Sequence, residues 1–532
     1  MPSLLTNGTP YELLGVMVSY IADFAYTRPD HLAVVMGETN KSYTYKQLDN
    51  ASIQVANMLH GFGLGFGSAV AILLENSIEM FEVMWACQRL GIRYTPISTR
   101  LTVAEVAYIV NDCGAEVYIT SQRFSQLAID LIAYTPRVRT RVMVGDAVDG
   151  YRAYADLKAT ASIAPTFEQL EGAPMLYSSG TTGRPKGIKR PHVKTPVGSS
   201  APLAVFMETP LRFSEDTVYL NPAPLYHAAP LAWSMTVQRF GGTVVCLEHF
   251  DAVTALDLIQ RHQITHGQFV PTMFVRMLKL PADVRDSYDV SSLQAVVHAA
   301  APCPVDVKRA MIAWWGPIIY EFYAATEGHG ATFLNSHQWL EHPGSVGRPI
   351  MGEIHICDDN NEELPIGEVG TIWFGGVPGV LEYHNDPEKT AEAHHPNGWV
   401  TVWDIGRVDT DGYLYLTDRK SHMIIAGGVN IYPQESEDVL ISHPLVADAA
   451  VIGVPDEEMG EQVKGVVQLV DPAQGTPEIA EFLIAHCRSK LAAFKCPKTI
   501  DFVAELPRQE NGKLYKRALR DQYWSTQGSK VI

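Results

Sequence analysis

The sequence predicts an α/β protein with a large N-terminal domain and a smaller α+β C-terminal domain. Short apolar runs alternate with helical patterns along most of the 532 residues, which is typical of parallel sheets covered by helices. From about Glu353 to Phe374 the pattern changes to closely spaced strands with Gly, Asn and Asp turns. This change indicates a small β-rich subdomain within a chain long enough for several buried cores.

The individual elements follow from hydrophobic periodicity. Amphipathic patterns predict helices over Ile78–Leu90, Ala255–Arg261, Met273–Leu280 and Ile479–Leu491. Short apolar runs predict strands over Ala69–Leu74, Tyr94–Ile97, Thr243–Leu247, Gly267–Val270, Ala295–Ala300, Ile318–Phe322, Ala447–Val454, Val463–Val470 and Thr499–Val503.

Composition excludes several classes of protein. The net charge of −18 argues against a nucleic-acid partner or an anionic membrane surface, and it fits a monomer or a small oligomer such as a homodimer. The seven cysteines form no C-x-x-C pair, so neither a zinc site nor a disulfide framework is indicated. The N-terminus does not resemble a signal peptide, and no apolar run is long enough for a membrane span. We expect a cytoplasmic protein.

Residues 177–187 read Tyr-Ser-Ser-Gly-Thr-Thr-Gly-Arg-Pro-Lys-Gly. Glycines let a backbone approach a ligand closely, while N–H groups, hydroxyls and an ammonium group can surround phosphate oxygens. The alternative is a Ser/Gly surface loop. The stretch lacks the Gly-Lys-Ser/Thr ending of a Walker A loop. The candidate phosphate ligands are Ser178, Ser179, Gly180, Thr181, Thr182, Gly183 and Lys186.

This stretch closely resembles the phosphate loop of the acyl-adenylate-forming superfamily, which includes acyl-CoA ligases, luciferases and the adenylation domains of peptide synthetases. Tyr323-Ala-Ala-Thr-Glu similarly resembles that superfamily's Tyr-Gly-x-Thr-Glu motif. The resemblance implies that Thr326 contacts the α-phosphate and that Glu327 binds Mg²⁺, while Tyr323, Ala324 and Ala325 adjoin the nucleotide. The alternative is a helix-capping threonine beside a solvated glutamate.

Further nucleotide contacts follow from the same resemblance. Asp404 in Trp-Val-Thr-Val-Trp-Asp matches the carboxylate that binds the ribose hydroxyls, and Arg419 joins it. A carboxylate suits a cis-diol because it accepts two hydrogen bonds. Adenine is expected to stack on the strand end at Ala299, Ala300, Ala301 and Pro302, although small residues there could serve packing alone.

The acid is expected to bind among apolar and small side chains. His227, in Pro-Leu-Tyr-His, resembles the family's gate beside the acyl carboxylate, although a buried structural histidine is the alternative. No Lys or Arg stands out that would bind a second carboxylate, so an apolar fatty, aromatic or polycyclic acid is favoured. The expected pocket residues are His227, Phe269, Val270, His298, Ala299, Tyr323 and Ala324.

The C-terminal motifs resemble segments of the family that belong to a mobile domain, and the resemblance implies the same mobility here. Gly427 and Gly428 resemble the motif that lines the pantetheine channel for CoA, with a β-turn as the alternative. Lys513 matches the lysine of Pro-x-x-x-x-Gly-Lys that bridges the carboxylate and the α-phosphate. By resemblance, Ser421 is the hinge. The expected domains are residues 1–417 (AMP-binding, with the acyl and ATP sites), a hinge at 418–421, and residues 422–532.

Together these motifs predict an AMP-forming acyl-CoA ligase that uses Mg²⁺, ATP and CoA, with Lys513, Thr326 and His227 in catalysis. The chain departs from the family where Ala324, Trp403 and Ala299 replace glycines and where Ser421 replaces Asp or Lys. These departures keep a second interpretation open, an enzyme that only transfers a preformed acyl-adenylate to CoA. Adenylation for a carrier protein is a third interpretation, and nucleotide binding without catalysis is a fourth.

Overall fold

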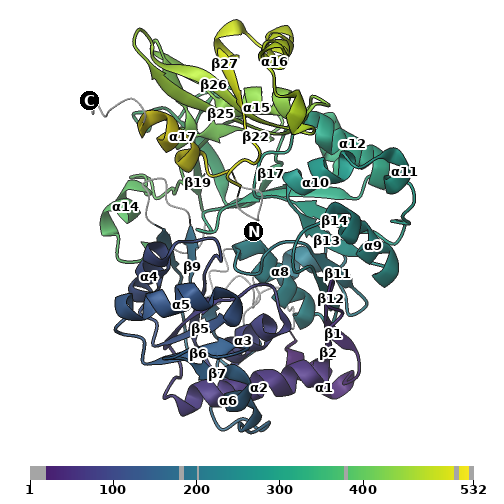
Figure 1. Ribbon diagram of the computed structural model, residues 1–532, viewed down its shortest axis with the longest axis vertical. Helices are drawn as coiled ribbons and strands as arrows, with labels where there is room; N and C mark the ends of the chain where they lie inside the picture. The colour runs from purple at the N-terminus through teal and green to yellow at the C-terminus, as the bar shows by residue number, and fades with distance from the viewer. Residues whose placement is uncertain (1–18, 179–184, 200–202, 377–381, 509–513, 526–532) are drawn as a thin grey trace, which may run out of the picture. The chain divides into compact units, whose positions relative to one another are not determined.

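The structure is a computed structural model that describes residues 19–178, 185–199, 203–376, 382–508 and 514–525 (Figure 1). Its contacts divide the chain into two compact units. The first unit comprises residues 1–268, 288–295 and 382–387, and the second comprises 269–287, 296–381 and 388–532. The expected boundaries at 417 and 421 stay a prediction.

A six-stranded parallel sheet forms one part of the first unit, in the order β7-β6-β5-β3-β4-β8. Helices α3 (Ile78–Arg89) and α4 (Val103–Asp112) connect its strands, and the side chains of the preceding residues, Ser77 and Thr102, cap them. The strands are β3 (Ala69–Leu73), β4 (Arg93–Pro96), β5 (Val117–Ser121), β6 (Thr140–Val144), β7 (Arg152–Ala153) and β8 (Ala173–Pro174). The first two strands and α3 lie within one residue of their predicted bounds.

A second group of strands in the first unit runs in the order β13-β11-β12-β1-β2, parallel except for β2. Its interior strands are almost wholly buried, which explains their continuous apolar runs. These elements are β1 (Leu32–Met36), β2 (Ser42–Thr44), β11 (Val218–Asn221), β12 (Thr243–Cys246), β13 (His266–Phe269), α8 (Ala228–Arg239) and α9 (Ala252–His262).

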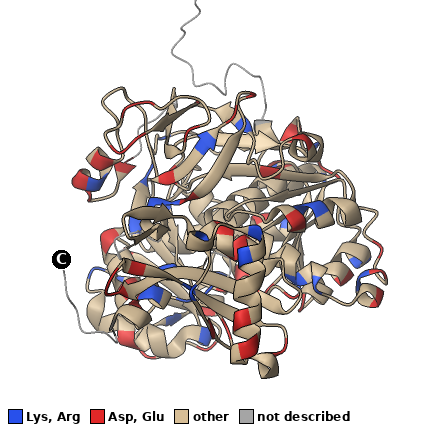
Figure 2. Ribbon diagram, turned by 90° about the horizontal axis from the view of Figure 1, so that it is seen from above, with Lys and Arg blue, Asp and Glu red and all other residues tan. Residues whose placement is uncertain are grey.

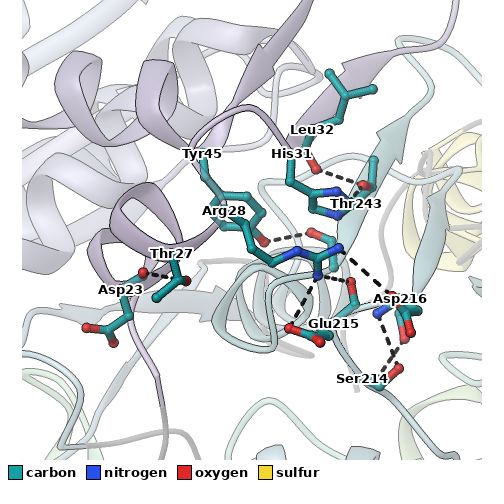
Figure 3. Close-up of polar contacts among 12 residues, drawn as sticks. Asp23, Thr27, Arg28, His31, Leu32, Tyr45, Ser214, Glu215, Asp216 and Thr243 are labelled. Atoms are coloured by element: carbon teal, nitrogen blue, oxygen red, sulfur yellow. Dashed lines mark hydrogen bonds and ion pairs between the residues drawn. The ribbon is translucent and has the colours of Figure 1, made fainter.

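Polar contacts fix the beginning of the described chain onto this sheet (Figure 3). Arg28, next to α1 (Ile21–Thr27), donates to the Glu215 carbonyl at 3.0 Å and lies 3.4 Å from the Glu215 carboxylate. The Tyr45 hydroxyl donates to the Gly242 carbonyl at 2.7 Å, and Thr243 Oγ1 donates to the Leu32 carbonyl at 2.7 Å. The contacts connect the end of α1 to the turn before β11, and the first residue of α2 (Tyr45–Gly61) to the turn before β12.

A small antiparallel sheet in the first unit has the order β20-β10-β9. Its strands are β9 (Leu176–Ser178), β10 (Lys186–Lys189) and β20 (Glu382–Tyr383). The two ends of the expected phosphate loop are therefore neighbouring strands.

The second unit begins with four strands in the order β17-β16-β15-β14. β14 and β15 are parallel, whereas β15, β16 and β17 pair antiparallel. The elements are α10 (Pro271–Leu278), β14 (Ala295–His298), α12 (Val305–Trp315), β15 (Ile319–Ala324), β16 (Ala331–Leu334) and β17 (Arg348–Met351).

The predicted β-rich subdomain is an antiparallel sheet in the order β18-β19-β21-β22. Its strands are β18 (Glu353–Cys357), β19 (Gly370–Gly375), β21 (Asp404–Val408) and β22 (Leu414–Arg419). The antiparallel register places Asp404 directly opposite Arg419.

The C-terminal part has the predicted α+β character. Its sheet has the order β24-β23-β26-β25, with β27 parallel to β26. Helices α15 and α16 pack on this sheet over a core that includes Leu440, Val451 and Leu483. The elements are β23 (Ile424–Ala426), β24 (Val429–Ile431), α15 (Pro433–Ile441), β25 (Val446–Asp456), β26 (Gly460–Leu469), α16 (Pro477–Lys490), β27 (Thr499–Phe502) and α17 (Lys516–Ser525).

The remaining helices are α2 (Tyr45–Gly61), α5 (Ser125–Leu131), α6 (Tyr154–Ala159), α7 (Ala204–Glu208), α11 (Ala282–Arg285), α13 (Ser336–Glu341) and α14 (Pro387–Glu392). Each helix of the described ranges is too short or too polar to cross a membrane. All seven cysteines lie in these ranges and carry free thiols. Figure 2 shows Asp and Glu residues interspersed with Lys and Arg residues along the ribbon.

Candidate active site

The structure describes both ends of the expected phosphate loop. Ser178 ends β9, Lys186 begins β10, and the two residues pair in register. Lys186 is 8 % exposed, and its Nζ lies 4.9 Å from the centroid of the Tyr383 ring. The other expected phosphate ligands, Ser179, Gly180, Thr181, Thr182 and Gly183, lie outside the described residues.

Asp404, the expected ribose ligand, has both carboxylate oxygens engaged. Arg419 Nε lies 3.1 Å from Asp404 Oδ1, and the Tyr323 hydroxyl donates to Asp404 Oδ2 at 2.7 Å. The Asp404 carboxylate raises the pKa of Arg419 above its ordinary value. Each carboxylate oxygen can accept more than one hydrogen bond, so Asp404 keeps acceptor capacity for a diol.

Tyr323 remains a hydrogen-bond donor because burial, followed by the Asp404 charge, raises its pKa well above the ordinary value. The buried His329 ring meets the Tyr323 ring edge-on, and His329 Nε2 lies 3.5 Å from the Tyr323 hydroxyl. Burial lowers the pKa of His329, which favours its neutral form. Sequence analysis missed this histidine, and its place two residues after Glu327 was the available signal.

Thr326 and Glu327 lie half-buried in a turn after β15, which Gly328 N closes by donating to the Ala325 carbonyl at 2.9 Å. The Glu327 charge also raises the pKa of Arg419, by less than the Asp404 charge does. Both carboxylates therefore act on the same guanidinium group. Within the described residues, no three His, Cys, Asp or Glu side chains gather as a metal site. A single carboxylate still fits Mg²⁺ that takes its other ligands from phosphates and water.

The expected adenine strand end has an unusual backbone. Ala299 is buried and follows β14, whereas Ala300 and Pro302 are exposed and Ala301 is half-buried. Ala300 has φ 76°, in the left-handed region that costs a non-glycine residue about 1–2 kcal/mol. The family resemblance indicates that Ala299 replaces a glycine, whereas the left-handed backbone conformation occurs one residue later, at Ala300.

The imidazole of His298 is fully buried between β14 and the helices that cover it. Its Nε2 lies 3.4 Å from Glu321 Oε2, which also binds Lys308, and its ring contacts the Phe274 ring at 5.5 Å. Burial, and then the Lys308 charge, lowers the pKa of His298 well below its ordinary value. The role of His298 in the acid pocket stays a prediction.

Two further expected pocket residues occupy element boundaries in the second unit. Phe269 is fully buried at the end of β13, where its ring contacts Phe274 and Trp315 at 5.7 Å. Val270 follows as the residue before α10. The Phe269 side chain therefore belongs to an aromatic core cluster.

His227 is the residue before α8 in the first unit. Its carbonyl accepts a hydrogen bond from Leu231 N at 3.1 Å, and its half-buried ring lies 4.5 Å from the Tyr226 ring. The start of a helix thus fixes the backbone of the expected gate residue.

Two of the departures from the family have visible structural consequences. Ala324 is exposed at the end of β15. Trp403 has φ 61°, a conformation that favours glycine, and its N–H donates to Thr401 Oγ1 at 3.0 Å. A tryptophan therefore occupies a strained backbone position directly before Asp404.

Ser421, the expected hinge residue, lies in a short 3-10 turn over Lys420–His422. The preceding Asp418 accepts hydrogen bonds from His422 Nδ1 at 3.2 Å and from Gln434 N at 3.1 Å. Burial acts to raise the pKa of Asp418, but Lys516 and His422 outweigh it and hold that pKa at about 2. Asp418 thus connects this turn to the start of α15.

Gly427 and Gly428 form the turn between β23 and β24, with φ 57° and 79°. A Cβ at Gly427 would lie 2.3 Å from Met459 Cε, whereas a Cβ at Gly428 would meet no atom within 4 Å. Gly428 is exposed and therefore has an open side.

Lys513 lies outside the described residues, but the chain on both sides of its segment is described. Arg508 pairs with Leu514, and Tyr515 N donates to the Pro507 carbonyl at 2.8 Å. Arg508 also binds the Asp448 carboxylate with two nitrogens. This ion pair anchors Arg508, the last described residue before the segment that contains Lys513.

The second unit therefore brings Tyr323, Asp404 and Arg419 into contact, with Glu327 close enough to act on them electrostatically. Ser178, Lys186 and His227 belong to the first unit. A carboxylate held by an arginine and a tyrosine, beside a Thr-Glu turn, is chemically suited to a nucleotide and its metal ion.

Comparisons with known proteins agree with these motifs. Residues 21–384 match the family model described as AMP-binding enzyme, and residues 435–513 match the AMP-binding enzyme C-terminal domain. The chain is 31 % identical over 508 residues to the long-chain-fatty-acid–CoA ligase FadD13 of Mycobacterium tuberculosis, covering 94 % of this chain and 97 % of the relative. It is 33 % identical over 498 residues to a feruloyl-CoA synthase of Amycolatopsis sp, covering 93 % and 96 %.

Solved structures show the same architecture. The anthranilate CoA ligase AuaEII in complex with anthranoyl-AMP superposes with a TM-score of 0.81 at 26 % identity, covering 96 % of this chain and 98 % of that one. The ATP-bound MatB of Rhodopseudomonas palustris gives a TM-score of 0.77 at 29 % identity, covering 95 % and 99 %.

Proposed function

The chain belongs to the AMP-binding enzyme family, and on that premise we propose how its residues divide the work of an AMP-forming acyl-CoA ligase. The enzyme is an acid–thiol ligase that acts through an acyl-adenylate. The acid's carboxylate attacks the α-phosphorus of ATP and pyrophosphate leaves. The CoA thiolate then attacks the carbonyl carbon of the adenylate and AMP leaves.

The observation that carries the nucleotide assignment is the carboxylate of Asp404 between Arg419 and Tyr323. We assign the ribose hydroxyls to Asp404, because its orientation is already fixed and it keeps free acceptor capacity. Fixing the ribose aligns the α-phosphate with the incoming carboxylate, which lowers the entropic part of the barrier.

The residues that we assign to the phosphates stabilise the negative charge that develops during adenylation. Lys186 and the Thr326 hydroxyl stabilise the triphosphate, and Lys513 stabilises the oxygens between the acid and the α-phosphate. Glu327 would hold a Mg²⁺ ion, which neutralises phosphate charge when bound. Gly428 admits the pantetheine arm, for which its open side is the supporting observation.

We propose that the acid is apolar. Ala324 is small and exposed at the strand end, and His227 is the residue that we assign to the acid's carboxylate. Two relatives are named for long-chain fatty acids and for a feruloyl group, which are largely apolar acids. A dicarboxylic acid would need a second cationic partner, and the proposed pocket residues include no Lys or Arg.

The test measures pyrophosphate exchange into ATP and the consumption of free CoA thiol against a panel of fatty, aromatic, polycyclic and dicarboxylic acids. We expect both signals with one or more apolar acids and neither with dicarboxylic acids of equal length. A preference for dicarboxylic acids would contradict the proposed pocket. Omitting Mg²⁺ should abolish exchange.

The strained backbone at Trp403 favours a second candidate function, transfer of a preformed acyl-adenylate to CoA with weak adenylation. An indole one residue before Asp404 could displace the ribose and misalign the α-phosphate, whereas an adenylate needs only the thiol to arrive. Rapid exchange of labelled pyrophosphate by the unmodified enzyme would exclude this candidate. A cytoplasmic location and a homodimer also stay predictions, which cell fractionation and sedimentation velocity test.

A further inference from the structure

The two strands that flank residues 179–184 belong to one small sheet with a third strand from far along the chain. Lys186 of β10 pairs with Ser178 of β9 on one side, and Ile188 pairs with Tyr383 of β20 on the other. A strand almost 200 residues later therefore borders the lysine. All these residues lie in the first unit.

The ring of Tyr383 lies beside the lysine's charge. Lys186 Nζ is 4.9 Å from the centroid of that ring, and the residues are 8 % and 2 % exposed. An aromatic face attracts a cation, and the attraction strengthens when water is excluded from both groups. The contact restricts a long side chain that would otherwise sample many rotamers.

Asp112, the last residue of α4, holds the strand that carries Tyr383. Asp112 Oδ1 accepts from Asn385 Nδ2 at 3.0 Å, and Oδ2 accepts from the Tyr177 hydroxyl at 2.6 Å. The Asp112 carbonyl lies 3.0 Å from His384 Nε2. One helix end therefore connects the strand before the phosphate segment to the strand that bears the aromatic ring.

A close approach completes this arrangement. A Cβ on Gly187 would lie 3.0 Å from the Tyr177 ring, and the Gly187 carbonyl accepts a hydrogen bond from His384 N at 2.8 Å. Glycine at this position leaves room for the Tyr177 ring of β9 to pack against β10.

We propose that Tyr383 is a positioning residue for adenylation, because its ring fixes the ammonium group of Lys186 for the triphosphate. This inference rests on the proposed function and deepens it. Tyr383 touches neither substrate nor phosphate in this role, and it acts through the lysine. Adenylation needs the triphosphate, whereas transfer from a preformed acyl-adenylate does not, so only the first half-reaction depends on Tyr383.

The experiment compares Tyr383→Leu with Tyr383→Phe, which keeps the aromatic face. We expect Tyr383→Leu to raise the KM for ATP in pyrophosphate exchange by roughly 3- to 30-fold. Tyr383→Phe should keep the KM for ATP close to that of the unmodified enzyme. Acyl transfer from a synthetic acyl-adenylate to CoA should change less than about twofold in either variant, because that step does not use the triphosphate. Tyr151→Leu is the control, since Tyr151 is another buried tyrosine of the first unit and its hydroxyl bonds to Ala128.

A double-mutant cycle separates positioning from a general structural role. In a Lys186→Met background, Tyr383→Leu should cause no further rise in the ATP KM, because the cation is gone. Additive effects, or equal losses in the Phe and Leu variants, would overturn the proposal. If Tyr383→Leu does not fold, Tyr383→Met completes the same cycle.

Failure of the proposed function would look different. If the unmodified enzyme exchanges no pyrophosphate with any acid, the same cycle is measured by equilibrium binding of ATP. If Lys186→Met alone leaves both exchange and ATP binding unchanged, the lysine is not used and the proposal falls with it.

Discussion

The hydroxyl of Tyr323 donates a hydrogen bond to Oδ2 of Asp404 across 2.7 Å. The two residues lie 81 positions apart, on strands of different sheets in the second unit. Because Tyr323 keeps its proton and Asp404 is an acceptor, the bond orients the carboxylate before any nucleotide arrives.

Replacing Tyr323 with Phe should therefore weaken nucleotide binding. A hydrogen bond to a charged group contributes about 1.5–3 kcal/mol, so we expect the KM for ATP to rise roughly tenfold or more. Steady-state pyrophosphate exchange measures the change. Tyr320→Phe is the matched control, because Tyr320 lies on the same strand and stacks on Phe333 at 5.6 Å. Equal effects of the two substitutions would contradict the assignment of Asp404 to the ribose.

Asp438 should make stability depend on pH. Burial, reinforced by Glu437, raises the pKa of Asp438 to about 7, above its value of about 3.9 in an unfolded chain. The folded state therefore binds the proton of the Asp438 carboxyl group more tightly than the unfolded chain does. The stability that this group contributes is full below about pH 4 and is lost as the pH rises to about 7. Asp438→Asn should gain stability relative to the unmodified enzyme between pH 5 and pH 8, as measured by urea unfolding. Glu481→Gln, at an exposed position, should show no such trend.

Gly428→Leu should block the transfer step. A side chain at Gly428 enters open space where we place the pantetheine arm, so CoA transfer should fall at least about tenfold while exchange stays within about twofold. Gly367→Leu is the control, because Gly367 also has a positive φ and no atom within 4 Å of a Cβ. If exchange falls together with transfer in a folded protein, the channel assignment is wrong.

Lys513→Ala should act on the other half-reaction. Removing a cation that stabilises developing charge typically costs about 10²–10³ in rate, so pyrophosphate exchange should fall by that order. Transfer from a synthetic acyl-adenylate should be spared, which a thiol assay would measure. Lys498→Ala removes an exposed lysine of the same domain and serves as the control. Parallel loss of both half-reactions would refute the role of Lys513.

Trp403→Gly should relieve backbone strain next to Asp404. Glycine adopts φ 61° without the penalty of about 1–2 kcal/mol that a residue with a side chain incurs there. The thermal stability of the Trp403→Gly variant should therefore fall less than the loss of the tryptophan side chain alone would cause. If Trp403 and Ala324 limit adenylation, restoring glycine at both positions should raise the exchange rate sharply. Unchanged exchange would leave the ordinary two-step ligase as the account of this enzyme.

The helices and strands that local periodicity predicted are present in the structure, although other elements were not predicted. The strands predicted over Thr243–Leu247 and Thr499–Val503 are found as β12 (Thr243–Cys246) and β27 (Thr499–Phe502). Helix α16 (Pro477–Lys490) begins two residues before its predicted start at Ile479, because Thr476 caps it. Residues that repeat with a fixed period bury one face, and this requirement is local.

What the sequence by itself determined is the chemistry that is available: the Ser/Gly/Thr segment ending in Lys186, the Thr326–Glu327 pair, Asp404 and Lys513. Only the tertiary structure decided the partners. Tyr323 reaches Asp404 because β15 ends near the start of β21, and Tyr383 reaches Lys186 because β20 pairs with β10. Pairings between distant segments depend on sheet register and close packing, which no local pattern encodes. The strained backbones of Ala300 and Trp403 were hidden for the same reason, since surrounding contacts impose them.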